Sequence, residues 1–168
     1  MSKIISIIII ILLAILIGAL VYFFYPLPQE EEMVLVKVFF SNSYEDPKGI
    51  FCDKVYFAER EVPKAEMSPS ITTRLGGVAL EELLKGPTDA EKEGWFFTNI
   101  NPGVIIQNLE IENGTVIADF DKTLEQGVGG SCKVSAIRAQ ITETLKQFPE
   151  IEEVIISIDG RIEDILQP

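Results

Sequence analysis

The sequence contains no histidine and only two cysteines, and its 14 basic residues face 26 acidic ones. Histidine is the commonest general base and the commonest metal ligand, so its absence excludes Ser-His-Asp and Cys-His catalysis and ordinary zinc sites. The formal net charge of −12 repels phosphate backbones and argues against nucleic acid as a partner. Phosphate-binding glycine motifs are also missing, so the sequence predicts no cofactor.

The longest single feature is an uninterrupted apolar run from Ile4 to Tyr25. Its 22 residues span about 33 Å as a helix, and a bilayer's hydrocarbon core is about 30 Å thick. The sequence therefore predicts a transmembrane anchor over residues 1–25 that contacts the bilayer through residues 4–25. Lys3 precedes the run and acidic residues follow it, which places the N-terminus inside and the rest of the chain outside a bacterial cytoplasmic membrane.

A cleaved secretory signal is the alternative interpretation of this run, and it would give a secreted protein. Signal peptides have apolar regions of about 7–15 residues followed by a small-x-small cleavage site. This run is longer and ends in the four aromatic residues 22–25, which suit a membrane–water boundary. No cysteine lies at its end to carry a lipid. Both interpretations export the remainder of the chain.

Two further segments follow the anchor. Residues 26–33 form a proline-containing, acidic spacer, and residues 34–168 are long enough for one domain with its own core. Apart from Lys3, 13 basic residues face 26 acidic ones. This charge repels anionic lipid head groups, so we expect the domain to stand away from the membrane surface.

Cys52 and Cys132 both fall in the exported part, where an oxidising compartment favours a structural disulfide. The bridge would close a loop of about 80 residues and contribute about 4–5 kcal/mol in the chain-entropy model. Two unpaired, buried thiols are the alternative, and no C-x-x-C spacing indicates a redox motif. The glycine-rich stretch 127–131 fits no anion-binding motif and is interpreted as the loop that lets Cys132 reach Cys52.

The exported part mixes strand and helix patterns. Strands are expected at residues 34–40, 54–62, 104–112, 115–120 and 154–158, and helices at 72–85, 89–93 and 131–147. Thr88 followed by Glu91 is a capping box for the short second helix. Residues 154–158 are apolar on both faces, which predicts a central strand. The order predicts an α/β (α+β) domain with one mixed sheet and helices packed on it.

Asn113-Gly114 is the strongest short-range signal in the domain, because this dipeptide favours the two-residue turn of a β-hairpin. The turn sets Glu112 opposite Thr115 and fixes the register of both strands. One face of the hairpin would then be apolar and the other acidic. The apolar face would carry Leu109, Ile111, Val116, Ala118 and Phe120, and the outer face Glu110, Glu112, Thr115, Ile117 and Asp119.

Two pairs of residues are candidates for an interaction surface. Asp119 and Asp121 are two residues apart, and a hydrolase or a calcium site would need their carboxylates to converge with others in a cleft. On a solvated sheet face they serve solubility, which we expect here. Trp95 and Phe96 are either core residues, as large aromatics usually are, or part of an exposed contact surface.

Several blocks of the exported part, taken in order, resemble the GerMN domain family of sporulation and germination proteins. The matching text is VKVFFSNS (36–43), EREVP (59–63), ALEELLKGPT (79–88), INPG (100–103), ENGTVIADF (112–120), SAIRAQITETLKQFP (135–149) and VIISIDG (154–160). The resemblance implies an extracytoplasmic α/β module, similar in fold to ring-building modules of secretion and sporulation complexes. It implies no catalytic residues and no cofactor. This chain departs from the sporulation member in carrying a single copy and no lipid-modified cysteine.

Together these observations predict a non-enzymatic, membrane-anchored module that acts through protein–protein contacts at the cell envelope. Its partner would be an unknown envelope protein or a second copy of itself, in a process related to sporulation or germination. Two alternatives stay open. The acidic hairpin face could bind an envelope glycan or a cation, or the Asp119–Asp121 pair could serve a carboxylate-dependent hydrolase.

Overall fold

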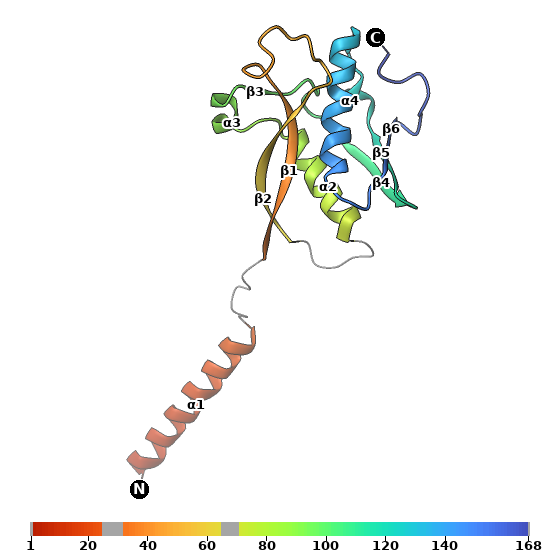
Figure 1. Cartoon of the computed structure of the whole chain (residues 1–168). Coiled ribbons are helices and arrows are strands. Elements are labelled where there is room, and N and C mark those ends of the chain that lie inside the picture. The colour runs from red at the N-terminus through yellow and green to blue at the C-terminus, as the bar shows by residue number, and fades with distance from the viewer. Residues whose placement is uncertain (1, 25–31, 65–70, 168) are drawn as a thin grey trace. The chain divides into compact units, whose positions relative to one another are not determined.

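The computed structural model divides the chain into two units (Figure 1). It describes residues 2–24, 32–64 and 71–167. The first unit, residues 1–32, holds one helix, and the second, residues 33–168, holds all the other elements. The expected spacer at 26–33 lies outside the described residues except for Glu32 and Met33, and Met33 already belongs to the first strand.

Helix α1 (Ser2–Phe24) forms the first unit and is apolar around its whole circumference. Within it, the segment Ile4–Tyr22 carries no charged side chain and buries none of its side chains. A helix that is apolar on all sides needs lipid or a protein interior around it. By length and composition this one can cross a membrane, and a signal sequence would meet the same criteria.

The first sheet has three antiparallel strands in the order β2-β1-β3. Its strands are β1 (Met33–Asn42), β2 (Tyr56–Pro63) and β3 (Phe96–Phe97). Val36, Val38 and Phe40 are buried, whereas Leu35 and Lys37, which alternate with them, are exposed. This period of two is typical of a strand that covers a core on one face. The two long strands confirm the predicted ones, with ends shifted by one or two residues.

The second sheet is mixed and has the order β4-β5-β6. Its strands are β4 (Ile106–Glu112), β5 (Thr115–Phe120) and β6 (Glu153–Ile158), of which β4 pairs antiparallel and β6 parallel with β5. The predicted hairpin register is confirmed, with Glu112 opposite Thr115. Both turn residues have positive φ, +50° at Asn113 and +81° at Gly114, as the two-residue turn requires.

The expectation that residues 154–158 form a central strand is wrong, because β6 lies at the edge of its sheet. Ile156 and Ile158 face the core, as expected. On the opposite face, Ile155 is only half-buried, and it lies beside Ile117 in the parallel register with β5. The second face of β6 is therefore apolar because Ile155 pairs with Ile117 across the two strands, and no further strand beside β6 is needed to explain it.

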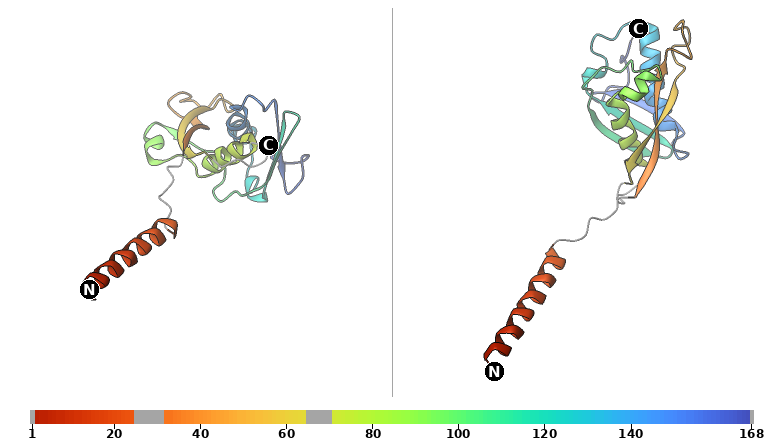
Figure 2. Two further views of the ribbon diagram at one scale, coloured as in Figure 1. Left: turned by 90° about the horizontal axis from the view of Figure 1, so that it is seen from below. Right: turned by 90° about the vertical axis from the view of Figure 1, so that its left-hand side faces the viewer.

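Helices α2 and α4 lie between the two sheets (Figures 1 and 2). The domain's helical segments are α2 (Ile71–Leu84), α3 (Asp89–Glu93), the 3₁₀ turn η1 (Lys122–Leu124) and α4 (Ser131–Lys146). Helix α2 contacts β1 and β4, and α4 contacts β1 and β6. The predicted capping box is confirmed, since the Glu91 N–H donates to Thr88 Oγ1 and the Thr88 N–H donates to the Glu91 carboxylate.

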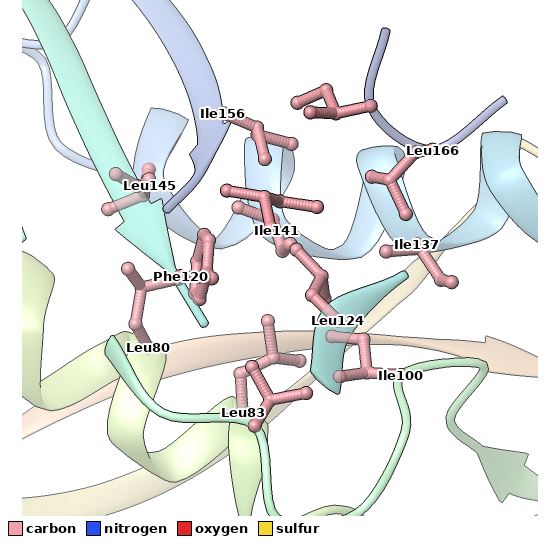
Figure 3. Close-up of a cluster of buried hydrophobic side chains, with 14 of the residues drawn as sticks. Leu80, Leu83, Ile100, Phe120, Leu124, Ile137, Ile141, Leu145, Ile156 and Leu166 are labelled. Carbon is pink, nitrogen blue, oxygen red and sulfur yellow. The ribbon is translucent and has the colours of Figure 1, made fainter. Parts of the chain in front are cut away.

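The larger of two clusters of buried apolar side chains fills the space between the sheets (Figure 3). Phe120 on β5 and Leu80 on α2 are fully buried, and so are Ile137 and Ile141 on α4. The C-terminal segment returns to this core with Leu166, which the sequence analysis did not anticipate. The α+β class is confirmed, and the strands form two separate sheets rather than one because helices occupy the layer between them.

Candidate functional site

Five large apolar side chains are exposed on two segments at one end of the first sheet, and we call them the aromatic end. They are Tyr44, Ile50, Phe51, Trp95 and Phe97, with exposed fractions between 44% and 70%. The segments are the β1–β2 loop (43–55) and residues 94–97, which lie close together in Figure 1 and hydrogen bond to each other. Aromatic groups exposed together are typical of interaction surfaces.

Trp95 is held in the left-handed backbone region, with φ of +68°. For a bulky residue this conformation costs about 1–3 kcal/mol, so its surroundings must enforce it. The Trp95 N–H donates to the Lys92 carbonyl at 3.0 Å, and its carbonyl accepts from the Ser43 N–H at 3.1 Å. These bonds fix both sides of the residue and leave its side chain 60% exposed.

The β1–β2 loop is ordered by two side chains that bond to its backbone. Buried Asn42 accepts from the Tyr44 N–H at 2.9 Å and donates to the Gly94 carbonyl at 2.9 Å, so it joins the two segments of the aromatic end. The Asp46 carboxylate accepts from the N–H groups of Ile50 and Phe51. The apolar side chains of this loop are therefore displayed on a defined backbone.

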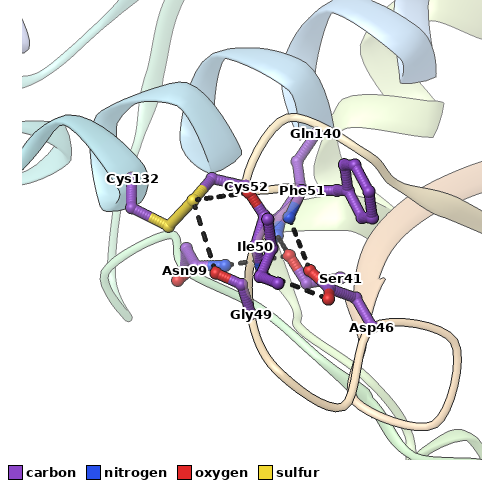
Figure 4. The surroundings of a disulfide bond; sticks show 9 residues. All are labelled: Ser41, Asp46, Gly49, Ile50, Phe51, Cys52, Asn99, Cys132 and Gln140. Atoms are coloured by element: carbon purple, nitrogen blue, oxygen red, sulfur yellow. Dashed lines mark hydrogen bonds between the residues drawn. A yellow bond between two sulfur atoms is a disulfide. The ribbon is translucent and has the colours of Figure 1, made fainter.

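A disulfide between Cys52 and Cys132 joins the same loop to the first turn of α4 (Figure 4). The two Cα atoms are 5.0 Å apart, and 80 residues separate the cysteines in sequence. The pairing is the one that the sequence analysis favoured. In Figure 4, Phe51 and Asp46 lie on the loop that this bridge holds.

A pocket of about 180 Å³ lies between the loop, β3 and α4, and the disulfide and the rings of Phe51 and Phe97 form part of its lining. Ser41 and Asn99 also line it and belong to a polar network with Gln140. Ser41 Oγ accepts from Asn99 Nδ2 at 2.9 Å and from Gln140 Nε2 at 3.2 Å. These bonds join Ser41 to the segment that follows β3 and to α4, and the pocket has room for about one large side chain.

The two aspartates are structural in ways that the sequence did not indicate. Asp119 Oδ1 accepts from Ser157 Oγ at 2.6 Å and from the Gly160 N–H at 2.9 Å, and so ties β5 to β6. Asp121 caps η1. Hydrogen bonds from Thr123, and further backbone bonds, lower the pKa of Asp121. Both side chains are half-buried, so the expectation that they serve only solubility on a solvated face is wrong.

Trp95 and Phe96 separate into the two roles that the sequence left open. Phe96 is half-buried and packs against the core, whereas Trp95 is exposed. Both lie beside the first sheet, while Asp119 and Asp121 belong to the second, so the four candidates do not form one surface. The sequence analysis missed the apolar pair Ile50-Phe51. Two large apolar residues inside a polar, turn-rich loop were the signal that could have indicated an exposed contact.

Metal chemistry gains no support from the arrangement of side chains. Within the described ranges, no group of three or more aspartate, glutamate, cysteine or histidine side chains is placed to hold a metal ion. Glu110, on the acidic face of the hairpin, is exposed and accepts from Asn108 Nδ2 at 2.9 Å. The structure therefore offers a contact surface at the aromatic end rather than a cluster of converging carboxylates.

Comparison with protein families gives one match over most of the chain. The model of the Germane family, described as "sporulation and spore germination", matches residues 37–164. No curated protein matches the chain significantly.

Solved structures with the same fold have low sequence identity to this chain. The tandem GerMN domains of the sporulation protein GerM from Bacillus subtilis superpose with a TM-score of 0.55 at 18% identity, over 82% of this chain and 43% of that one. The first GerMN domain of the same protein gives 0.50 at 20% identity, over 80% and 92%. A Clostridium perfringens protein assigned as a lipoprotein gives 0.51 at 14% identity, over 82% and 80%.

Proposed function

The chain belongs to the Germane family, and on that premise we propose that it is a membrane-tethered, extracytoplasmic module that acts through protein–protein contacts rather than catalysis. Helix α1 would hold it in the cytoplasmic membrane of a bacterium, with residues 33–168 outside. The process would be related to sporulation or germination. A sporulation protein and a protein assigned as a lipoprotein are among the structures that share its fold.

The tether is supported by the character of α1. A segment of 19 apolar residues with no buried side chain is unstable in water and stable in a bilayer. The disulfide agrees with export, because such bonds persist in oxidising compartments. A reporter fused to the C-terminus tests this part. Activity of a reporter that works only outside the cytosol is the expected result, and activity of a cytosolic one would overturn it.

The observation that carries the contact function is the aromatic end itself. A strained Trp95, a loop fixed by Asn42 and Asp46, and a disulfide all serve to present apolar side chains to solvent. Tryptophan and tyrosine are enriched among residues that dominate binding energy, because they bury large areas at low entropic cost. The pocket beneath the loop would receive one side chain of the partner.

Photo-crosslinking in the native membrane tests the contact surface. The full chain would carry p-benzoylphenylalanine at Trp95, and a matched chain would carry it at Ile117, which is also exposed but lies on the second sheet. A discrete adduct is expected from position 95 alone. An adduct of twice the 18.7 kDa chain mass would identify a second copy as the partner, and any other mass an envelope protein.

Two outcomes would contradict the proposal. One is no adduct at position 95 in membranes where the chain is folded, as judged by its melting transition. The other is an equal pattern of adducts at positions 95 and 117, which would indicate random collisions. Loss of a cell-wall hydrolytic activity in an Asp119→Asn, Asp121→Asn double variant that remains folded would instead favour the hydrolase alternative.

A further inference from the structure

Strands β1 and β4 each have an edge beside a helix, and the two edges differ in whether side chains of that helix cover them. Strand β1 pairs with β3 only at its last two residues, so the rest of that edge faces α4. Strand β4 is one of the two edge strands of the second sheet, and it contacts helix α2. An exposed strand edge carries unpaired N–H and C=O groups, which proteins usually cover.

The β1 edge is closed by side chains of α4. Gln147 Oε1 accepts from the Lys37 N–H at 2.7 Å, and Gln147 Nε2 donates to the Lys37 carbonyl at 2.7 Å. Thr144 Oγ1 accepts from the Phe39 N–H at 3.1 Å. These contacts imitate the bonds of a neighbouring strand, so no further strand can add there.

The β4 edge is open. Because Glu112 and Thr115 face each other across a two-residue turn, the alternation of an antiparallel pair points the backbone groups of Leu109 and Ile111 away from β5. In the part of the chain that the structure describes, no hydrogen bond joins the backbone of residues 107–111 to any group outside β5. Two donors and two acceptors thus face outward along a regular stretch of strand.

A groove runs beside this edge. Two hollows of about 530 and 380 Å³ lie between α2 and the residues around β4, and both include Glu81 and Ile106 in their lining. Together they follow α2 from Thr73 to Lys85, which is about 18 Å at 1.5 Å per residue. At about 3.3 Å per residue, this length holds five or six residues of extended chain.

Glycine keeps the groove open on the helical side. Gly77 lines the first hollow, and a Cβ added there would meet only the Leu109 side chain, at 3.7 Å. Val78 and Leu84 are half-buried and form an apolar floor. Of the two residues with outward backbone groups, Leu109 lines the first hollow together with Val78, so free backbone groups and an apolar side chain meet there.

We propose that this groove binds an extended segment of a partner protein, which adds to β4 as a fourth strand of the second sheet. Free peptide groups specify a polypeptide backbone as the occupant, because only a strand offers donors and acceptors at matching intervals. Alternate side chains of the segment would pack on Val78 and Leu84.

The edges of β2 and β6 suit an added strand less well. Strand β2 carries Glu59, Arg60 and Glu61 in succession and ends at Pro63, and charges and proline guard edges against pairing. The last residue of β6, Ile158, is already bridged to Arg161. The groove also lies on elements other than those of the aromatic end, so this site is separate from the proposed contact surface.

The test uses the full chain in nanodiscs of phosphatidylcholine and a phage-displayed library of random 12-residue peptides. Enriched peptides would be synthesised and their binding measured by fluorescence anisotropy. We expect binding to slow hydrogen exchange at the amides of Leu109 and Ile111. Gly77→Gln should weaken binding at least tenfold by closing the groove, while Gly129→Gln, at a loop glycine with open space around it, should leave binding unchanged.

A backbone scan of the peptide keeps the test independent of how well the Gly77 variant folds. N-methylation of every second peptide nitrogen should abolish binding, and methylation of the intervening nitrogens should not, since a strand uses alternate groups. Equal effects at all positions, unchanged exchange at Leu109 and Ile111, or no enriched peptide would each overturn the proposal. So would a dimer paired through β4 without peptide, which would make a second copy the occupant.

Discussion

The two sheets of this domain are assembled in different ways. In the second sheet, a two-residue turn sets the register of β4 and β5, and the groups involved are neighbours in sequence. In the first sheet, a long loop separates β1 from β2, and bonds between distant residues hold the strands. Lys37 bonds to Gln147, 110 residues away, and the disulfide joins residues 80 apart.

Arg60 shows most clearly how the first sheet depends on bonds between residues that are distant in sequence. It lies on β2 with its side chain 9% exposed, and it forms ion pairs with Glu82 at 3.2 Å and Glu91 at 2.6 Å. It also donates to the carbonyls of Glu82 and Gly86, so one guanidinium ties β2 to α2 and to the start of α3. Local signals can therefore build a hairpin, whereas a sheet whose strands are far apart needs such ties.

The largest test of this difference is removal of the disulfide. The variant Cys52→Ser, Cys132→Ser should lose about 4–5 kcal/mol of unfolding free energy in urea, because the unfolded chain regains the entropy of an 80-residue loop. Hydrogen exchange should quicken more in β1 than in β5. Ser131→Ala, beside Cys132, serves as the control. A reduced protein with an unchanged melt, or equal acceleration in both sheets, would contradict the comparison.

Replacement of Arg60 comes next in size. Arg60→Met keeps most of the apolar length and removes the buried guanidinium from the carboxylates of Glu82 and Glu91, at a cost of about 2–4 kcal/mol. Lys85→Met removes an exposed partner of the same Glu82 and should change stability by less than about 0.5 kcal/mol. Chemical denaturation of both variants measures the difference. Equal losses would show that the buried guanidinium has no special role.

The second sheet should be sensitive at its turn. Gly114→Ala forces a Cβ onto a residue with φ of +81° and brings it to 3.3 Å from the Glu152 side chain, so we expect a loss of about 1–2 kcal/mol. Gly129→Ala has no such contact and should be neutral or slightly stabilising. Thermal melts compare them. If Gly114→Ala lost as much unfolding free energy as Arg60→Met, the first sheet would not depend more than the second on bonds between distant residues.

Acid should weaken both sheets through different carboxylates. Burial acts to raise the pKa of Glu91, but the hydrogen bonds and charge of Arg60, and the bonds from Thr88, outweigh it and lower that pKa. The stability that this shift supplies is fully present above the ordinary carboxyl pKa and is lost as pH falls through the lowered value. The same sign holds for Asp121, through its bonds from Thr123.

This pH dependence can be divided between the sheets by substitution. Urea midpoints measured from pH 7 to pH 3 should fall less steeply in Glu91→Gln and in Asp121→Asn than in the unchanged chain, although both variants start lower at pH 7. Glu143→Gln is the control, because none of the hydrogen bonds or ion pairs described above involves the Glu143 carboxylate. A slope in Glu91→Gln equal to that of the unchanged chain would contradict the assignment.

Much of the domain could be predicted because the signals were local. The hairpin register followed from Asn113-Gly114, the start of α3 from the Thr88–Glu91 capping box, and the disulfide from compartment and cysteine number. The exposed aromatic end could not be predicted in the same way. Whether Trp95 or Phe96 turns outward depends on a left-handed backbone that Ser43, from another strand end, helps to fix.

An apolar segment long enough for a bilayer, an acidic domain without histidine, and the positions of the principal helices and strands could all be read from the amino-acid sequence. These properties depend on composition and on contacts within a few residues. Long-range packing instead sets the division of the strands into two sheets, the edge position of β6, and the difference between the closed edge of β1 and the open edge of β4. Those outcomes depend on which distant residue comes to lie near a strand edge, Gln147 with a side chain that bonds to β1 or Gly77 with no side chain, and no short-range pattern records that.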